Sequence, residues 1–174
     1  MKVRIVLLPD KKLTEETKKA SVLIASKVLT HFKLDESHIP HVTITSLEVE
    51  DSFLKEIIKL VKNYSDFRQI KIKTNEVNIG KKTFIVLYFQ EDSLIKKFRE
   101  KVIQSLDKYN TEDIILQEPH ITLTRVISEN DALKALALVK DFQKENYYLN
   151  NVAICKDGPN GTCTEIKAQF TLKG

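Results

Sequence analysis

Two short stretches of the chain are nearly alike, and they constrain the fold more than any other feature. The first reads Pro40-His41-Val42-Thr43-Ile44-Thr45 and the second Pro119-His120-Ile121-Thr122-Leu123-Thr124. Behind each proline, polar residues alternate with β-branched or aliphatic ones, which is typical of a half-buried strand. Because side chains alternate across a strand, each stretch should present one imidazole and the threonine hydroxyls that follow it to the same space.

The rest of the chain repeats one order of elements around these two strands. Hydrophobic periodicity predicts, for the first half, a strand at 2–8, a helix at 14–32, the first His-Thr strand at 41–49, a helix from 51 or 52 and a strand at 67–79. The second half gives a strand at 83–89, a helix from 92 or 93, the second His-Thr strand at 120–127, a helix from 130 or 131, and strands at 147–155 and 163–172. The two histidines stand 79 residues apart (120 − 41), close to half of the 174-residue chain. This pattern indicates an internal duplication.

A duplicated unit of this kind predicts an α+β fold of antiparallel sheet with flanking helices. Two related units fold most simply into two lobes about a pseudo-twofold axis, with equivalent strands side by side or facing each other across a central groove. We therefore expect one bilobal domain over residues 1–174, with approximate halves 1–80 and 83–174, and we expect the two histidines to converge. Apolar spacing also places certain helix residues inward, among them Leu94, Leu133, Leu136 and Ala137.

Composition excludes several classes of protein. The chain is 42% hydrophobic and 30% charged, with four Gly and four Pro, which is typical of a globular domain rather than a disordered one. No apolar stretch approaches the ~20 residues that a membrane span needs, and the apolar start of the chain is too short for a signal peptide. We therefore expect a cytoplasmic protein with no membrane partner. Nothing in the sequence demands a dimer, so a monomer is expected.

The positive charges are unevenly placed along the chain. Net charge is +4, and residues 54–101 hold 12 basic and 6 acidic side chains. Such an excess suits a phosphate-bearing partner, although lysines that simply keep a surface soluble would explain any single one of them equally well.

The two cysteines, Cys155 and Cys163, flank a Gly-Pro-Asn-Gly turn. They could face each other across a hairpin and pair, but free buried thiols are the expectation for a reducing compartment. Their spacing lacks the partner residues of a zinc site.

Two imidazoles facing one centre form a catalytic pair. Near neutral pH one can be neutral and take a proton from an attacking water, while the other is protonated and gives a proton to a leaving oxygen. Hydroxyls beside them can donate hydrogen bonds to non-bridging phosphoryl oxygens. This combination requires no metal and suits displacement at a phosphodiester, above all a strained cyclic one.

The stretches His41-Val42-Thr43-Ile44 and His120-Ile121-Thr122-Leu123 resemble the paired HxTx motifs of the 2H phosphoesterase superfamily, which includes 2′-5′ RNA ligases and RNA 2′,3′-cyclic phosphodiesterases. The second stretch, continued to Arg125, is similar to the His-x-Thr-Leu-x-Arg pattern of that group. The resemblance implies a bilobal fold with a groove lined by both motifs and a metal-independent cyclic phosphodiesterase without a cofactor. It implies that His41 and His120 are the catalytic acid and base, in an order left open, and that Thr43 and Thr122 bind phosphate.

Arg125 is a further phosphate-binding candidate. In a regular strand it would point to the face opposite His120, yet its length would let it reach a phosphate around the strand end. Thr45 and Thr124 would share the catalytic face one step further in, where packing is the more frequent role.

Several alternatives stay open at this stage. The substrate could be a tRNA half, an oligonucleotide end, a cyclic mononucleotide or an ADP-ribose cyclic phosphate, with specificity set by loops 33–39, 110–118 and 156–162. A module of the same fold could bind RNA or nucleotides with little turnover, and the reverse reaction would give 2′-5′ RNA ligation. A metal site using both histidines lacks a third ligand at suitable spacing.

Overall fold

The structure is a computed structural model that describes residues 1–81, 83–90, 92–106, 109 and 118–174. Two single-turn helices, η1 (Asn63–Asp66) and η2 (Pro159–Gly161), occur beside the main elements. The main helices and strands of the described residues are β1 (Lys2–Pro9), α1 (Lys11–Ala25), β2 (Thr30–Lys33), β3 (Val42–Glu48), α2 (Asp51–Lys62), β4 (Ile70–Ile79), β5 (Phe84–Phe89), α3 (Ser93–Ser105), β6 (His120–Val126), α4 (Glu129–Val139), β7 (Asn146–Asp157) and β8 (Cys163–Thr171).

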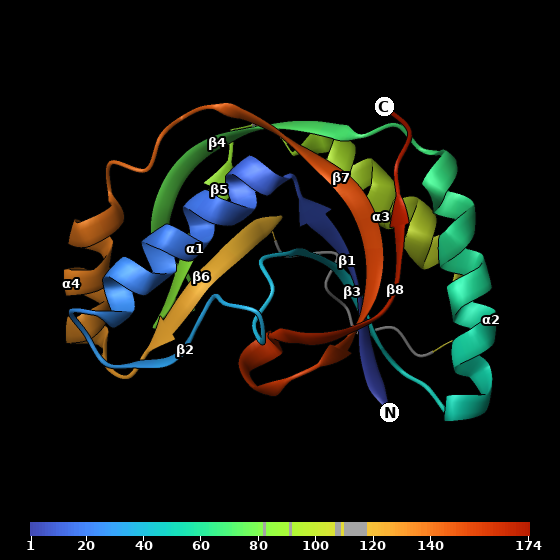
Figure 1. The fold of residues 1–174 in the computed structure, drawn as a ribbon, viewed down its shortest axis with the longest axis horizontal. Helices are drawn as coiled ribbons and strands as arrows, with labels where there is room; N and C mark the ends of the chain where they lie inside the picture. Colours follow the sequence, from blue (N-terminus) through green and yellow to red (C-terminus); the bar gives the residue numbers. More distant parts are fainter. Residues whose placement is uncertain (82, 91, 107–108, 110–117) are drawn as a thin grey trace.

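The predicted α+β fold with its repeated element order is confirmed. The first half supplies β1, α1, β3, α2 and β4, and the second supplies β5, α3, β6, α4 and β7, while β2 and β8 are additions to this scheme. In Figure 1, α4 lies on one side of the curved sheet, α2 and α3 lie on the other, and α1 crosses the front. The sheet and its flanking helices therefore follow the predicted arrangement.

The strands form one sheet in which every pairing between named strands is antiparallel. The pairings close a ring that runs β1-β3-β6-β5-β4-β7 and returns to β1, with β8 on β7 and β2 on β6. The last strand of each half pairs with the first strand of the other half, β4 with β5 and β7 with β1. Each lobe thus contains strands of both halves. This supports one bilobal domain over 1–174, with halves 1–80 and 83–174, which we propose as the domain organisation.

A large apolar core, to which all four main helices contribute, lies between this sheet and the flanking helices. Ile5 of β1, Ile44 of β3, Leu87 of β5 and Leu123 of β6 are fully buried in it, so both lobes share one interior. Each such side chain contributes roughly 1.5–3 kcal/mol by leaving water. The core fixes the face that each strand turns inward, and with it the face that each strand turns toward the site.

The prediction of a helix over 14–32 is wrong at both ends. Asp10 caps the helix, because its side chain accepts a hydrogen bond from the backbone N–H of Leu13 at 2.9 Å, and α1 ends before Ser26. Phe32 lies in β2, which pairs with the end of β6. The apolar spacing of four residues continues to Phe32 by coincidence. Phe32 is buried in the core, but as part of a strand and not of the helix.

Three of the helix residues predicted to face inward are exposed, although Ile95, Phe98, Val102 and Leu106 are buried as predicted and Leu136 packs against the core. Leu94 is 53% exposed and Leu133 is 63% exposed, and Ala137 is exposed as well. Ser128 caps α4 by accepting from the N–H of Asp131, ahead of the predicted cap at 130 or 131. The buried residues of α4 are instead small or β-branched ones that allow close approach to the sheet, namely Ala132, Ala135 and Val139.

The expectation of free thiols is corrected by the structure. Cys155 and Cys163 are joined as a disulfide with a Cα–Cα distance of 5.6 Å. Both are fully buried in a small second core with Val6, Leu8 and Ala153. The residues lie at neighbouring positions across the β7–β8 hairpin, where the Cα spacing suits a bridge.

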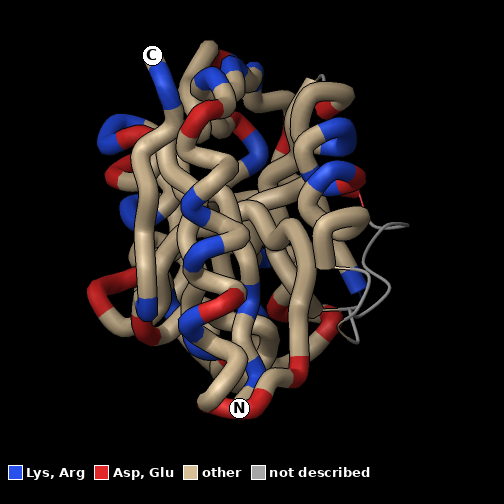
Figure 2. The backbone as a smooth tube through the Cα atoms, turned by 90° about the vertical axis from the view of Figure 1, so that its right-hand side faces the viewer, with Lys and Arg blue, Asp and Glu red and all other residues tan. Residues whose placement is uncertain are grey.

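Charged residues of both signs are interspersed along the side of the molecule in Figure 2 rather than gathered on a face of one sign. No helix among the described residues is long and apolar enough to cross a membrane.

Candidate functional site

The two His-Thr strands meet at the centre of the sheet. Val42 of β3 pairs with Ile121 of β6 in antiparallel register. Continuing this register by one residue on each side sets His41 beside Thr122, and Thr43 beside His120. Directly opposed residues have Cβ atoms about 4.5–5.5 Å apart and diagonal ones about 7–8 Å apart. Val42–Ile121 is the one pair between β3 and β6 in the described residues, and by this extension the two imidazoles and two hydroxyls would stand at the corners of a square, with the histidines on its diagonal.

Both imidazoles are held by the same kind of hydrogen bond, from Nδ1 to a backbone carbonyl. Nδ1 of His41 is 2.7 Å from the carbonyl oxygen of Ile39, and Nδ1 of His120 is 2.7 Å from the carbonyl oxygen of Glu118. A carbonyl only accepts, so each Nδ1 carries the hydrogen and donates it. Nε2 is then the nitrogen that gains or loses a proton. The intervening proline holds the chain extended, so the carbonyl two residues back meets the ring.

Each His-Thr strand carries a β-bulge one residue beyond its first threonine. In the β1–β3 pair, Thr45 is opposite Ile5 and Thr43 is opposite Val6, so Ile44 is an extra residue. In the β5–β6 pair, Leu123 is the extra residue in the same way. A bulge shifts the alternation of side chains. The equivalent irregularity in both strands is a further sign of duplication that no sequence pattern revealed.

The bulge of β6 corrects two predictions about its side chains. Thr124 does not share the groove face: it is fully buried, and its hydroxyl donates to the carbonyl oxygen of Phe32. Arg125 is half-buried and returns to the face of His120 and Thr122. Its guanidinium lies 5.1 Å from the centre of the Phe84 ring.

The first strand differs slightly at the equivalent positions. Thr45 is fully buried, so its expected place on the catalytic face is also wrong. Ser46 occupies the position that corresponds to Arg125, five residues after the histidine, and it is buried too. The first bulge therefore turns a small hydroxyl, and not a cation, toward this region.

A groove of about 460 Å³ opens over the square of motif residues. His41, Thr43, His120 and Thr122 all line it, so the structure brings four of the five predicted site residues together. Arg125 lies behind the rim, where it donates to the side-chain oxygen of Asn160. The other lining residues are Arg4, Gly80, Lys81, Phe84, Val86, Tyr88, Arg99, Glu118, Asn160 and Gly161.

Two arginines of the groove were missed by the sequence reasoning. Arg4 of β1 donates through Nη1 to the hydroxyl oxygen of Thr43 at 3.3 Å. Arg99 of α3 is only 3% exposed and donates through Nη2 to the carbonyl oxygen of Thr43 at 3.0 Å. The signal was present in the sequence, because each arginine interrupts an otherwise apolar pattern: Arg4 in a buried strand, and Arg99 one turn after Ile95 on the inner face of α3.

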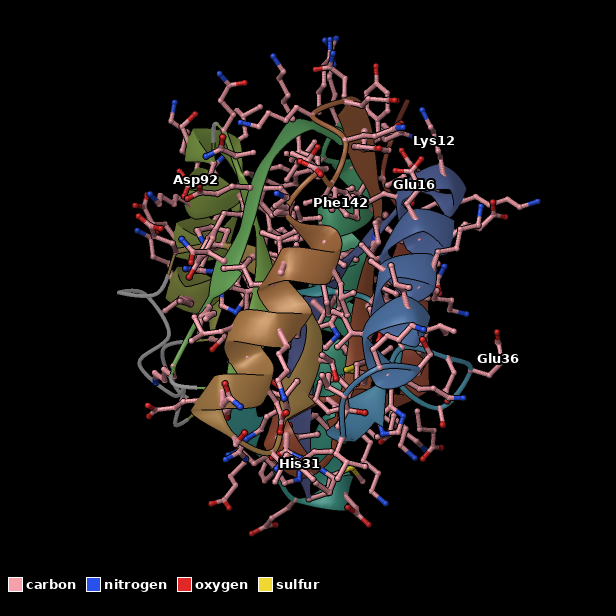
Figure 3. All side chains as sticks on the ribbon, turned by 90° about the vertical axis from the view of Figure 1, so that its left-hand side faces the viewer. Lys12, Glu16, His31, Glu36, Asp92 and Phe142 are labelled. Carbon is pink, nitrogen blue, oxygen red and sulfur yellow. A yellow bond between two sulfur atoms is a disulfide. The ribbon has the colours of Figure 1, made fainter. Side chains whose placement is uncertain are left out.

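The loops expected to set specificity reach the site in part. Ile39 of the first loop holds His41, and Asn160 and Gly161 of the third line the groove. Residues 110–117 of the second loop lie outside the described residues. Among the other histidines, His31 is exposed at the end of the molecule, as Figure 3 shows, and takes no part in the groove lining. Tyr147 is buried, and its hydroxyl bonds to Glu16 instead of reaching the groove.

The two imidazoles have different electrostatic surroundings. Burial lowers the pKa of His41 to about 4, and the charges of Arg4 and His120 act in the same direction. Burial also lowers the pKa of His120, with Arg99 adding to the effect, while the hydrogen bond to the Glu118 carbonyl and the Glu118 carboxylate oppose it. These shifts favour the neutral form of both rings, whereas a bound phosphate anion would favour protonation.

The chain and its fold were compared with known proteins. A family model described as the 2′-5′ RNA ligase superfamily matches residues 17–157. No curated protein sequence matches the chain. The solved structure of TT0787 from Thermus thermophilus is similar over 100% of this chain and 99% of its own, with a TM-score of 0.66 at 12% identity. E. coli LigT complexed with 3′-AMP is similar over 99% of this chain and 98% of its own, with a TM-score of 0.62 at 14% identity.

A further solved structure, the MHV ns2 PDE domain, is similar over 73% of this chain and 84% of its own, with a TM-score of 0.53 at 14% identity. At these identities the structural likenesses establish the fold. The family model, in contrast, covers most of the chain together with both motif strands. The chain therefore belongs to the 2′-5′ RNA ligase superfamily, the 2H phosphoesterase family that its paired motifs resemble.

Proposed function

We propose that this protein is a metal-independent phosphodiesterase that opens 2′,3′-cyclic phosphates on RNA ends or nucleotides. Superfamily membership supports a phosphodiesterase- or ligase-type function. The observation that supports the finer proposal is the shared groove, which His41, Thr43, His120 and Thr122 all line beside the Val42–Ile121 pair of β3 and β6. A phosphodiester in that groove would meet one imidazole on each side.

In the proposed reaction His41 is the general base and His120 is the general acid. The low pKa of His41, about 4, keeps its Nε2 free to accept a proton from water. As the new O–P bond forms, the P–O bond to one ribose oxygen breaks, and that oxygen takes the proton of His120. The product is a phosphomonoester beside a free hydroxyl, and the two imidazoles have exchanged protonation states. His120 suits the acid role better than His41 because burial lowers its pKa less.

The remaining motif side chains would bind the phosphoryl group. The hydroxyls of Thr43 and Thr122 line the groove and can donate to non-bridging oxygens, where charge gathers in the transition state. We propose Arg125 as a third phosphate ligand, which would exchange its bond to Asn160 for one to the substrate. Arg–phosphate pairs are among the stronger hydrogen-bonded contacts.

The proposal names no cofactor and no metal. Among the residues that the structure describes, no group of three or more His, Cys, Asp or Glu side chains is placed to hold an ion. Because the two imidazoles supply both proton transfers of the proposed reaction, activity should survive EDTA. The monomeric state and the cytoplasmic location expected from the sequence stay predictions.

The direct test replaces each catalytic histidine by alanine and measures turnover of nucleoside 2′,3′-cyclic phosphates and of RNA ending in one. His41→Ala and His120→Ala should each lower kcat/KM by about 10²–10⁴. His31→Ala, an exposed histidine outside the groove, is the matched control and should leave the rate unchanged. Full turnover in the double alanine variant would reject the mechanism, and tight binding of the substrate without turnover by the wild type would identify a binding module instead.

A further inference from the structure

We infer that Arg4 is a positioning residue of this reaction, which sets the direction of the Thr43 hydroxyl and the charge beside His41. The inference rests on the proposed function for what the groove does, and on the contacts of Arg4 for how it acts. Arg4 belongs to neither HxTx motif.

The guanidinium of Arg4 is fixed on three sides. Its Nε donates to Oδ1 of Asp157 at 2.5 Å, and the two side chains are only 15% and 8% exposed. Its Nη1 contacts Thr43. Its Nη2 lies against Gly161, where a Cβ atom would stand 3.1 Å away and where φ is +74°. Glycine adopts that backbone angle without strain and has no Cβ atom to fill that space, so the turn between β7 and β8 can pack closely against the guanidinium.

This arrangement decides where the hydroxyl hydrogen of Thr43 points. A guanidinium can only donate, so Oγ1 of Thr43 is the acceptor of the bond from Arg4. The hydrogen of Thr43 must then be directed away from Arg4, and the residue lines the groove. A non-bridging phosphoryl oxygen is the acceptor that the proposed substrate would place there. Arg99 holds the carbonyl of the same residue, so Thr43 is anchored at two points.

The corresponding arginine of the second lobe is placed differently in the part of the chain that the structure describes. Arg4 lies opposite Ser46, and the equivalent pair in the other lobe is Phe84 opposite Arg125. Each lobe thus has one arginine in this pair, but in the first lobe it comes from β1, the partner of the motif strand, and in the second from β6, the motif strand itself. Arg4 reaches the threonine of its own lobe, whereas Arg125 reaches the β7–β8 turn. The orienting role is therefore particular to the lobe of His41.

Arg4 and Asp157 act on His41 in opposite directions. The charged groups that face this imidazole are Arg4 on β1, His120 on β6 and Asp157 on β7; the first two lower its pKa and Asp157 raises it. Removal of Arg4 should raise the pKa of His41, and removal of the Asp157 charge should lower it further. A merely structural role for the ion pair predicts no such opposition of sign.

The experiment compares Arg4→Gln, Arg4→Lys and Asp157→Asn. Arg4→Gln should lower kcat by about 10- to 100-fold with KM little changed, and should move the acidic limb of kcat/KM to higher pH. Asp157→Asn should move that limb to lower pH. Arg4→Lys retains the charge but not the forked geometry, so the limb should stay in place while kcat falls.

Lys2→Gln is the matched control. Lys2 lies on the same strand and its Nζ is 3.6 Å from Asp157, but its side chain is 40% exposed and does not line the groove. Its removal should leave the limb and kcat unchanged. NMR titration of the His41 ring in wild type, Arg4→Gln and Asp157→Asn gives the same signs without turnover, so failure of the proposed function leaves this test intact. Shifts of equal sign in both variants, no shift in either, or a loss confined to KM would overturn the inference.

Discussion

The half of the molecule around His41 and the half around His120 have the same backbone arrangement beside the histidine. They differ in the side chains that surround each ring. In each, a proline precedes the histidine, and Nδ1 donates to the carbonyl two residues back. In each, a bulge follows the first threonine. These shared features are those that an internal duplication predicts, and both rings line one groove.

The surroundings explain how two equivalent rings could take different roles. His41 lies beside Arg4, while His120 lies beside Tyr88, whose ring centre is 5.8 Å from that of the imidazole, and near the Glu118 carboxylate. Burial and a nearby arginine lower the pKa of both rings and a carboxylate opposes this in both, but only for His41 is the fall large, to about 4. Unequal pKa values on a symmetric scaffold would let one ring act as the base and the other as the acid of the proposed reaction.

The largest effect that would test this contrast is the loss of one limb of the pH profile. His41 must be neutral, so kcat/KM of the wild type should fall as pH drops through the His41 pKa of about 4. His120 must be protonated, so kcat/KM should fall as pH rises through the His120 pKa, which burial holds below its usual value. The optimum should thus be acidic, and the His41→Ala and His120→Ala variants, each slower by about 10²–10⁴, should lose the acidic and the basic limb respectively.

Profiles of kcat/KM for one nucleoside 2′,3′-cyclic phosphate, measured from acidic to alkaline pH, give the answer. If His41→Ala removes the basic limb instead, the two roles are reversed. If both variants keep the same profile, the two halves do not differ in function and the contrast fails.

A second effect concerns the bulges themselves. Ile44 and Leu123 are the extra residues of the two strands, and both are fully buried. Replacing either by alanine should lower the free energy of unfolding by about 2–5 kcal/mol, because lost burial and a residual cavity add together. Urea unfolding would measure the free energy of unfolding of both variants. The two losses should be similar if Ile44 and Leu123 hold their strands in the same way.

The control for the bulge variants is Leu133→Ala, since Leu133 is 63% exposed and its truncation should change stability by no more than about 0.5 kcal/mol. A bulge variant as stable as this control would show that its strand is held by something other than the extra residue.

The sequence predicted the parts of this molecule that local patterns encode. Alternation around His41 and His120 placed both motif strands, and the repeat of element order gave the flanking helices and the shared site. The helix ends were less certain because tertiary contacts decide them: Phe32 follows the helical spacing but lies in β2, and Leu133 follows it but is exposed.

Long-range pairing accounts for what could not be predicted. A one-residue bulge leaves no mark on composition or period, yet it turns Arg125 to the groove face and Thr124 away from it. The closure of β7 on β1 brings Asp157 to Arg4 from 153 residues away. In the sequence, Arg4 and Arg99 stood out only as charges within apolar patterns. Only the structure shows that Arg4 contacts the Thr43 hydroxyl and that Arg99 contacts the Thr43 carbonyl.

The smallest predicted effect concerns the Cys155–Cys163 disulfide, which supports the backbone beside His41. The N–H of Ile39 donates to the carbonyl of Cys163 at 3.0 Å, and the carbonyl of Ile39 accepts from His41. The Cys155–Cys163 disulfide thus braces the hairpin on which the His41 ring depends. Replacing both cysteines by alanine should lower the free energy of unfolding by about 2–3 kcal/mol for so short a loop, with a change of only a few fold in rate.

Thermal and urea unfolding of the double variant, and of the wild type with and without a reductant, would measure this cost. Two titratable thiols in unreduced denatured protein would contradict the disulfide. The pH profile of the double variant carries the sharper information, because the hairpin bonds to Ile39 and not to Glu118, whose carbonyl holds His120. A change confined to the acidic limb would therefore connect the disulfide to the base alone, whereas equal changes in both limbs would mean that the hairpin supports the whole groove.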